Sequence, residues 1–211
     1  MALSEQDIEK ISRTISSAME DAIRALHRRY NKSKAGDRTL VEPHIDYDDH
    51  EALHAWCELA DEGDTCLVKF PHGQIIEVAK FGDLLWALDD WCKDGKYHFT
   101  WDEAMAEFED MEWRLPRASE WMALAEDNTI DRTTGGALGF FEDSFRTVKR
   151  GFTNTAGNLN FQSTYASWWT SSLSSGANAW YTRVGSTFVS PGTNGDNKAN
   201  GFSVRCVYDL S

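Results

Sequence analysis

Apolar residues recur at helical spacing along one face of residues 4–30, which predicts an amphipathic helix with Ser4 as its N-cap. Ile8, Ile11 and Ile15 also fit the a and d positions of a heptad, and isoleucine at both positions favours trimers or larger assemblies. The helix could pack on its own domain or bring several copies of the chain together, and the pattern leaves both alternatives open. We therefore treat residues 1–35 as an N-terminal helical segment that is a candidate for homo-oligomerisation.

The next segment, residues 36–63, is predicted to be a helical extension. A short strand is expected over 39–45, where Pro43 interrupts it. Asp48 or Asp49 then caps a helix that runs to about Ala60, and Gly63 ends it.

Local signals predict the elements of a third segment, residues 64–211. β-rich runs at 65–70 and 74–80 flank a Pro-His-Gly turn and predict a hairpin. Residues 84–92 fit either a strand or a helix. Thr100 and Glu103 form a capping box at the start of one helix, and residues 119–125 predict a second. Residues 126–145 are rich in Gly and Thr, with Phe140, Phe141 and Phe145 as apolar anchors.

Short strands are predicted at 168–172, 179–184 and 202–207, separated by long polar stretches that include a loop at 192–200. Such stretches bury too little apolar surface to form a core. Loops of this length are usually functional or disordered. The aromatic residues on both sides favour an ordered, functional region.

Composition limits the class of protein. The chain has 211 residues, 41% of them hydrophobic, and nine Trp, which excludes a disordered chain. The net charge of −13 argues against nucleic acid and anionic membrane surfaces as partners. No apolar run approaches about 18 residues, so no membrane insertion is expected. The polar N-terminus does not resemble a signal peptide. The four cysteines lack the spacing of a metal site, so we expect reduced thiols with at most one disulfide pair. These features together predict a cytoplasmic or virion-associated protein.

One short motif suggests chemistry. His50, Glu51 and His54 match H-E-x-x-H, in which two histidines one turn apart bind zinc and the glutamate acts as a base. Here the helix is expected to begin at the motif, after Asp48 and Asp49, so a solvated first turn is the simpler interpretation. A zinc-dependent hydrolase therefore stays an alternative function.

Other catalytic patterns are not found. The sequence contains no G-x-S-x-G and no Walker loop, and no histidine lies in the last third of the chain. The run Asn194-Gly195-Asp196-Asn197 offers oxygen ligands that could hold Ca²⁺, but Asx/Gly clusters mark turns first. We expect no enzymatic activity and no cofactor, with Ca²⁺ as the one weak alternative.

Several motifs, in order, resemble a known family. They are Trp-Arg-Leu-Pro at 113–116, Trp-Trp-Thr-Ser-Ser at 168–172, Asn-Ala-Trp-Tyr at 178–181 and Gly-Phe-Ser-Val-Arg-Cys-Val at 201–207. They resemble the Fibrobacter succinogenes major paralogous domain group, which is related to formylglycine-generating-enzyme-like domains. The resemblance covers about two-thirds of the chain. It implies an α+β protein with the C-type lectin fold over residues 64–211.

The resemblance has limits and consequences. Sulfatase-modifying relatives use a pair of cysteines near the C-terminus, whereas this chain has only Cys206 there. Members of the family are frequent targets of diversity-generating retroelements, which implies a variable protein of a phage or bacterium that binds a protein or glycan ligand. A structural subunit without a ligand is a further alternative.

The residue types from 165 to 200 support binding, because rigid aromatics with small polar residues are typical of recognition surfaces. Trp169, Trp180, Phe202 and Val204 are expected in the core. Glu120 and Arg205 are a candidate buried ion pair between helix and sheet, and two separate exposed charges are the alternative. The candidate ligand-binding and variable positions are Tyr165, Ser167, Trp168, Leu173, Ser175, Tyr181, Arg183, Ser186, Phe188 and Ser190.

Overall fold

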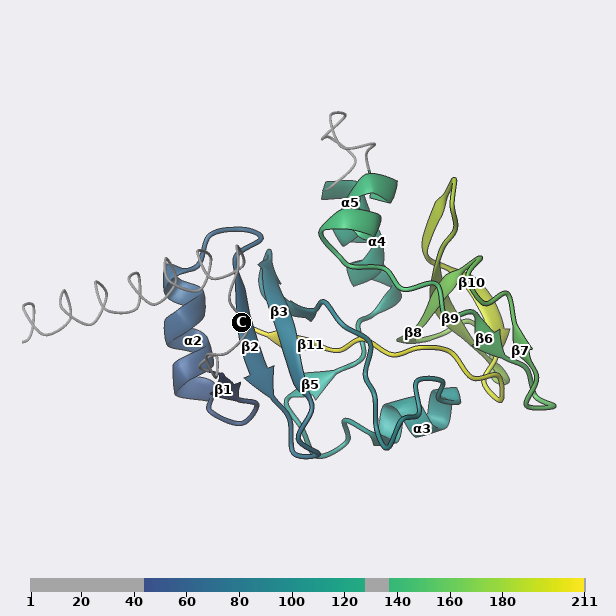
Figure 1. Ribbon diagram of the computed structural model, residues 1–211, viewed down its shortest axis with the longest axis horizontal. Helices are drawn as coiled ribbons and strands as arrows, with labels where there is room; N and C mark the ends of the chain where they lie inside the picture. Colours follow the sequence, from purple (N-terminus) through teal and green to yellow (C-terminus); the bar gives the residue numbers. More distant parts are fainter. Residues whose placement is uncertain (1–43, 128–136, 211) are drawn as a thin grey trace, which may run out of the picture.

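The structure is a computed structural model that describes residues 44–127 and 137–210. The helix predicted over residues 4–30, and with it the candidate oligomerisation segment 1–35, lies outside the described residues. So does most of the strand predicted over 39–45. The described chain is an α+β protein with helices on both faces of a central sheet (Figure 1).

The central sheet has six strands in the order β1-β2-β3-β4-β11-β5. β1 runs parallel to β2, and the other neighbours are antiparallel. The hairpin predicted around Pro71 is confirmed as β2 and β3, and the segment from Leu84 begins as a strand rather than as the alternative helix. The strands are β1 (Ile45–Asp46), β2 (Thr65–Lys69), β3 (Ile75–Phe81), β4 (Leu84–Ala87), β5 (Trp113–Arg114) and β11 (Val207–Asp209).

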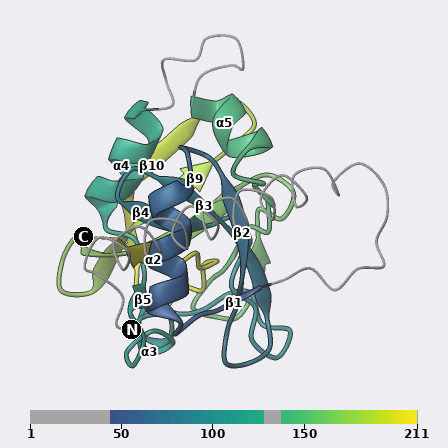
Figure 2. The same ribbon diagram turned by 90° about the vertical axis from the view of Figure 1, so that its left-hand side faces the viewer.

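Helix α2 (His50–Leu59) covers one face of this sheet (Figure 2). Asp49 caps it as predicted, since its Oδ1 accepts from the backbone N–H of Ala52 at 3.0 Å. Leu53, Trp56 and Cys57 are buried in the same hydrophobic core as the β2 and β3 side chains. Helix α2 and the β2–β3 hairpin therefore share one hydrophobic core across the domain boundary predicted near residue 64.

The opposite face of the sheet packs on α4 (Ala118–Asp127) and α5 (Ala137–Asp143). Successive side chains of β4 point to opposite faces of the sheet. Leu85 therefore lies in the core on the α2 side, whereas Trp86 packs on Trp121 of α4. The three phenylalanines at 140, 141 and 145 are buried here as predicted, although helix α5 was not predicted.

Helix α3 (Trp101–Ala106) begins with the predicted capping box. The Thr100 hydroxyl accepts from the Glu103 N–H at 3.3 Å, and the Thr100 N–H donates to the Glu103 carboxylate at 2.8 Å. These two bonds satisfy N–H groups that the helix cannot pair internally.

None of the helices in the described ranges has the length and apolar character that a membrane crossing requires.

A second sheet of three antiparallel strands lies at the end of the molecule opposite α2 (Figure 1). Its strands are β8 (Ala166–Leu173), β9 (Asn178–Val184) and β10 (Val189–Asn197). A short hairpin of β6 (Phe152–Thr153) and β7 (Leu159–Asn160) lies beside it. The strands predicted at 168–172 and 179–184 are confirmed, whereas of residues 202–207 only Val207 falls in a strand, β11.

The loop predicted over residues 192–200 is wrong up to Asn197, because β10 pairs with β9 along most of this stretch. The register shifts between Ser190 and Asn194, and Gly192 lies in this irregular part with φ +59°. A Cβ at Gly192 would lie 2.6 Å from the carbonyl oxygen of Ala118, so only glycine allows β10 to approach α4 here.

A buried carboxylate joins the second sheet to the rest of the protein. Asp90 accepts from the Arg205 Nε at 3.1 Å, the Arg150 Nε at 2.9 Å and the Trp168 Nε1 at 2.8 Å. The Arg205 guanidinium is fully buried and also donates to the carbonyl of Arg146 at 3.1 Å. Burial lowers the pKa of Arg205, and the Asp90 charge opposes this effect.

The ion pair predicted between Glu120 and Arg205 is therefore wrong. Arg205 lies in the interior with Asp90, and Glu120 pairs with Arg114 at the start of α4. Glu120 and Arg205 belong to different networks: the Arg205–Asp90 pair is fully buried, whereas the Arg114–Glu120 pair is partly exposed.

All four cysteines are free thiols, so no pair forms. Burial raises the pKa of Cys57 from 9.0 to about 12, although the Lys80 charge acts in the opposite direction. Burial also raises the pKa of Cys66 and of Cys206. These three thiols are therefore protonated, unreactive members of the core.

Candidate functional site

The ten predicted ligand-binding positions separate by exposure. Ser167, Trp168 and Tyr181 are only 1%, 0% and 4% exposed, so the prediction that they are displayed is wrong. Both faces of the second sheet are covered here, since Trp168 packs on Trp121 and Tyr181 packs on Phe202. The positions that are exposed or partly exposed are Tyr165, Leu173, Ser175, Arg183, Ser186, Phe188 and Ser190.

The predicted core positions are mostly confirmed. Trp169, Phe202 and Val204 are fully buried. Trp180 is only partly buried, so that prediction is wrong; its cross-strand partner on β10 is Gly195, which has no side chain to cover the indole.

The exposed positions fall at two ends of the second sheet. Leu173 and Ser175 lie at the β8–β9 turn. Arg183, Ser186 and Phe188 lie at the other end, where the register pairs Ala166 of β8 with Val184 of β9. Tyr165, which directly precedes β8, lies at this second end and contacts Phe188.

Aromatic rings form a continuous row at this end. Phe161, Tyr165 and Phe188 are joined by ring-centroid distances of 5.2 Å and 5.9 Å, and we call these three residues the aromatic row. Phe161 is 54% exposed and Phe188 is 39% exposed, although both are large and apolar. Phe161 was not predicted as a binding position, because it precedes residues 165–200, in which the candidate positions were sought. A lone phenylalanine within a polar run was the available signal.

The backbone holds this row in an uncommon conformation. Phe161 and Ser163 have φ of +55° and +62°, which non-glycine residues rarely adopt. The Ser163 N–H donates to the Lys149 carbonyl at 2.7 Å, and the Tyr165 N–H donates to the Phe161 carbonyl at 3.2 Å. Backbone strain of this kind clusters at functional sites. The ring of Phe188 in turn rests on Gly185, where a Cβ would lie 2.5 Å from it.

Arg183 lies beside the aromatic row, and no carboxylate of residues 44–127 or 137–210 forms an ion pair with it. Its guanidinium carbon lies 5.0 Å from the ring centroids of both Tyr165 and Tyr181. Its Nε is buried and has no hydrogen-bond partner within the described residues. Every other arginine in the described ranges is in an ion pair, namely Arg114, Arg117, Arg146, Arg150 and Arg205.

Two further polar atoms of the second sheet have no hydrogen-bond partner within the described ranges. Ser167 stands directly opposite Arg183 across β8 and β9, and its Oγ is buried and unpaired. Asn194 stands opposite Tyr181 across β9 and β10, and its Nδ2 is also buried and unpaired. Buried polar groups are normally hydrogen-bonded, so these three unpaired atoms are exceptions within the second sheet.

Two charges of opposite sign, Arg183 and Asp196, act on the hydroxyl of Tyr181. Burial raises the pKa of Tyr181, Arg183 acts to lower it, and Asp196 acts to raise it. Asp196 is occupied by its own turn, since its Oδ1 accepts from the Asn197 N–H at 2.7 Å and from the Asn200 Nδ2 at 2.9 Å. Of the candidate Ca²⁺ ligands in residues 194–197, Asp196 thus already accepts two hydrogen bonds from the chain itself.

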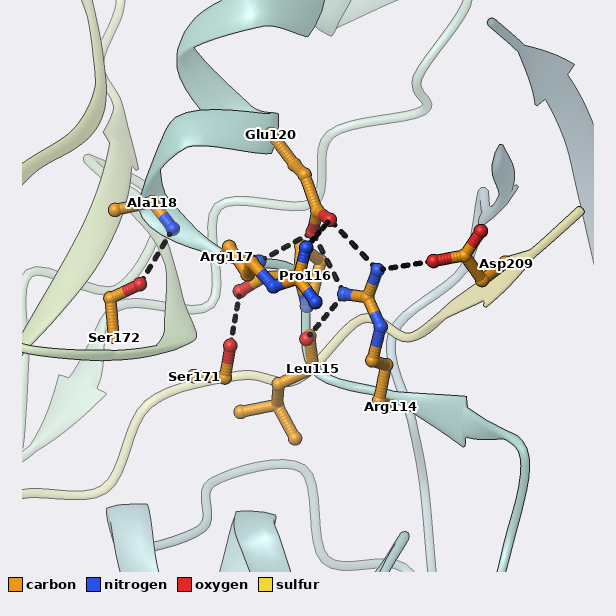
Figure 3. Close-up of polar contacts among 9 residues, drawn as sticks. All are labelled: Arg114, Leu115, Pro116, Arg117, Ala118, Glu120, Ser171, Ser172 and Asp209. Carbon is orange, nitrogen blue, oxygen red and sulfur yellow. Dashed lines mark hydrogen bonds and ion pairs between the residues drawn. The ribbon is translucent and has the colours of Figure 1, made fainter. Parts of the chain in front are cut away.

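The Trp-Arg-Leu-Pro motif connects the start of α4 to β8 and β11 (Figure 3). The Arg114 guanidinium donates to both oxygens of Glu120, at 2.8 and 2.7 Å, and to Asp209 at 3.3 Å. The N–H of Ser171 donates to the Pro116 carbonyl at 2.8 Å, and the N–H of Ala118 donates to the Ser172 hydroxyl at 3.1 Å. The start of α4 is therefore fixed to both β8 and β11.

This network also sets the ionisation of Glu120. Burial acts to raise the pKa of Glu120, but hydrogen bonds from the Arg114 guanidinium and the Arg117 backbone outweigh it and hold the pKa below the usual 4.5. The bidentate pair with Arg114 is the geometry in which such bonds are strongest.

The H-E-x-x-H residues have other partners. His50 Nδ1 lies 3.0 Å from a Glu112 oxygen and 3.1 Å from the Tyr208 hydroxyl, and the His54 ring packs edge-on against Tyr208. Glu51 is exposed. Residues 44–127 and 137–210 contain no group of three His, Cys, Asp or Glu side chains that could hold a metal ion.

One cleft of about 430 Å³ lies between α3 and the segment of Arg114 and Leu115, with Ser171 of β8 also in its lining. Met105, Phe108 and Leu115 give it a mostly apolar lining, and Asp102, Glu109 and Arg114 are its charged residues. Comparison of the chain with family models, with curated proteins and with solved structures finds no match.

Proposed function

We propose that this chain is a non-enzymatic binding protein that recognises a protein or glycan ligand with the aromatic row and Arg183. The observation that carries the proposal is the exposure of Phe161 and Phe188 beside Tyr165 on a rigid sheet. Exposed apolar patches rimmed by polar residues mark interaction sites. Aromatic side chains provide large contact area at low conformational cost.

The rest of the molecule suits this role. The second sheet is fixed to the protein by the Asp90 network and the Trp-Arg-Leu-Pro motif, so side chains at its end project from a rigid support. Binding sites on rigid elements lose less entropy when the ligand binds. The proposal is also supported by the residues at this end, where small polar side chains such as Ser186 and Ser190 surround the rings.

The test uses ligands selected on the full-length chain from a displayed random-peptide library and from a glycan array. Phe188→Ser is expected to weaken the binding of the selected ligands about thirtyfold, the effect of losing ~2 kcal/mol at an interface hot spot. The matched control is Ile75→Ser, an equally exposed apolar residue on β3, which is expected to leave binding unchanged. Selected ligands that bind both variants equally well would count against the proposal, and so would a failure to select any.

The C-type lectin fold and the diversification of exposed positions are part of the same proposal. They rest on the four family motifs, and the seven exposed candidate positions are the ones that could vary without disturbing the core. Sequencing of the locus should find a reverse transcriptase gene and a near-repeat of the 3′ coding end. Without these genes the variability is refuted, while the binding site stands.

The zinc-hydrolase alternative gains no support from the described residues, because His50 contacts Glu112 and Tyr208 and Glu51 points to solvent-exposed surface. Burial and the Glu112 carboxylate raise the pKa of Tyr208 to about 12, so its hydroxyl is protonated and donates to Glu112. A structural subunit without a ligand would give no reason to expose the aromatic row.

A further inference from the structure

We infer that the cleft between α3 and the segment of Arg114 and Leu115 is a docking site for a second partner, a peptide segment in which lysine or arginine residues flank an apolar side chain. We call this site the α3 cleft. It is separate from the site of the proposed function, because the α3 cleft and the aromatic row share no residue.

The size and lining of the α3 cleft suit an apolar side chain of a partner. Its volume of about 430 Å³ lies in the usual range of ligand pockets. Phe108 and Leu115 are buried, whereas Met105 is 37% exposed although it is large and apolar. The flexible, polarisable methionine side chain adapts to apolar groups of different shapes. A side chain such as leucine would therefore find apolar contacts in this cleft.

Two carboxylates flank Met105 along the chain. Asp102 and Met105 are three residues apart in α3, so they share a face of the helix. After α3 ends, the N–H groups of Phe108 and Glu109 donate to the carbonyls of Met105 and Ala106, at 3.3 and 3.4 Å. These tight turns keep Glu109 in the lining of the cleft. The lining therefore has the order acid, apolar, acid along this segment.

The negative charge of the α3 cleft is not neutralised within the described residues. Asp102 and Glu109 are exposed, and no lysine or arginine of residues 44–127 or 137–210 forms an ion pair with either. Arg114 is the third charged residue of the lining. It forms ion pairs with Glu120 and Asp209, which balance its charge.

The segment that carries the two acids is acidic throughout. Residues 101–112 contain six acidic residues and no basic one. Lys96 pairs with Glu103. Lys93 pairs with Glu107. The acids that remain attract cationic partners and repel acidic ones. The occupant that complements both the apolar lining and the charge is a basic segment with an apolar side chain between its cations.

The test uses three acetylated and amidated peptides, Lys-Leu-Lys-Leu-Lys, Lys-Ser-Lys-Ser-Lys and Glu-Leu-Glu-Leu-Glu. Binding to the full-length chain is followed through the NMR signal of the Met105 methyl group. The first peptide is expected to shift this signal. The serine peptide should bind about tenfold more weakly, because it has no apolar side chain to bury. The acidic peptide should not bind, because the carboxylates of the cleft repel it.

A charge-neutral variant tests the two carboxylates. Asp102→Asn combined with Glu109→Gln is expected to weaken binding of the first peptide about fivefold, the combined effect of two exposed ion pairs. The matched control is Glu58→Gln combined with Asp61→Asn, which removes two exposed carboxylates at the end of α2 and should leave the affinity unchanged. Phe188→Ser should also leave it unchanged.

The results that overturn the docking site are distinct from a failure of the proposed function. Equal binding of the basic and acidic peptides would overturn it, and so would equal affinity in the Asp102 and Glu109 variant and its control, or no shift at Met105. Loss of binding in Phe188→Ser would assign the basic peptide to the aromatic row, which overturns the α3 cleft and leaves the proposed function intact. The comparison of the three peptides on the unmodified chain does not depend on the folding of any variant.

Other occupants of the α3 cleft would give different results. Without peptide, a Met105 signal that moves when Lys32→Glu and Lys34→Glu are combined would assign the cleft to basic residues of the chain itself. A signal that moves with protein concentration alone would assign it to a second copy of the chain. Either result would overturn the assignment to a separate partner.

Discussion

Replacing Asp90 with alanine is expected to destabilise the fold by about 3–5 kcal/mol, because it leaves the fully buried Arg205 guanidinium without its counter-charge. Asp90 also accepts from Arg150 and from the indole of Trp168, so the substitution leaves three donors unpaired. The free energy of unfolding in urea, compared between variant and unmodified chain, measures this loss.

A matched control for that measurement is Asp110→Ala, which removes one exposed carboxylate and is expected to change stability by less than about 0.5 kcal/mol. Asp90→Asn keeps the shape of the side chain and removes its charge, and it should fall between the two. A loss below about 1 kcal/mol for Asp90→Ala would mean that the buried network does not hold the two sheets together.

The second large effect is expected for Trp168→Ala, with a loss of about 3–5 kcal/mol. The indole of Trp168 is fully buried, stacks on Trp121 at a centroid distance of 5.6 Å and donates to Asp90 at 2.8 Å. Removing it opens a cavity between the second sheet and α4 and breaks a buried hydrogen bond. The measurement is the same urea unfolding.

Leu173→Ala is the control on the same strand, because Leu173 is 52% exposed and its truncation should cost little. Trp168 and Leu173 were both predicted as ligand-binding positions, and comparing their two alanine variants shows which of them is a core residue. If Trp168→Ala kept its stability and instead lost ligand binding, the assignment of Trp168 to the core would be contradicted.

Local signals in the sequence were sufficient for the elements that local interactions stabilise. The cap at Asp49, the capping box of Thr100 and Glu103 and the hairpin around Pro71 each depend on residues a few positions apart. The strand β10 depends instead on pairing with β9, and its Pro, Gly, Asn and Asp residues indicate a turn when read alone.

The errors at the site have a common physical cause. Alternation along a strand indicates which residues share a face, but not whether another element covers that face. Trp168 and Tyr181 therefore looked equivalent to Arg183, although α4 covers the first and Phe202 covers the second. The partner of Arg205 lies 115 positions away, which no local pattern could indicate.

The most direct test of the binding surface is to map a selected peptide on the isotope-labelled, full-length chain by amide chemical shifts. We predict that the largest changes fall on residues 161–165 and 183–190, around Phe188 and Arg183. Changes confined to α2 around His50, or to the cleft beside Met105, would contradict the account.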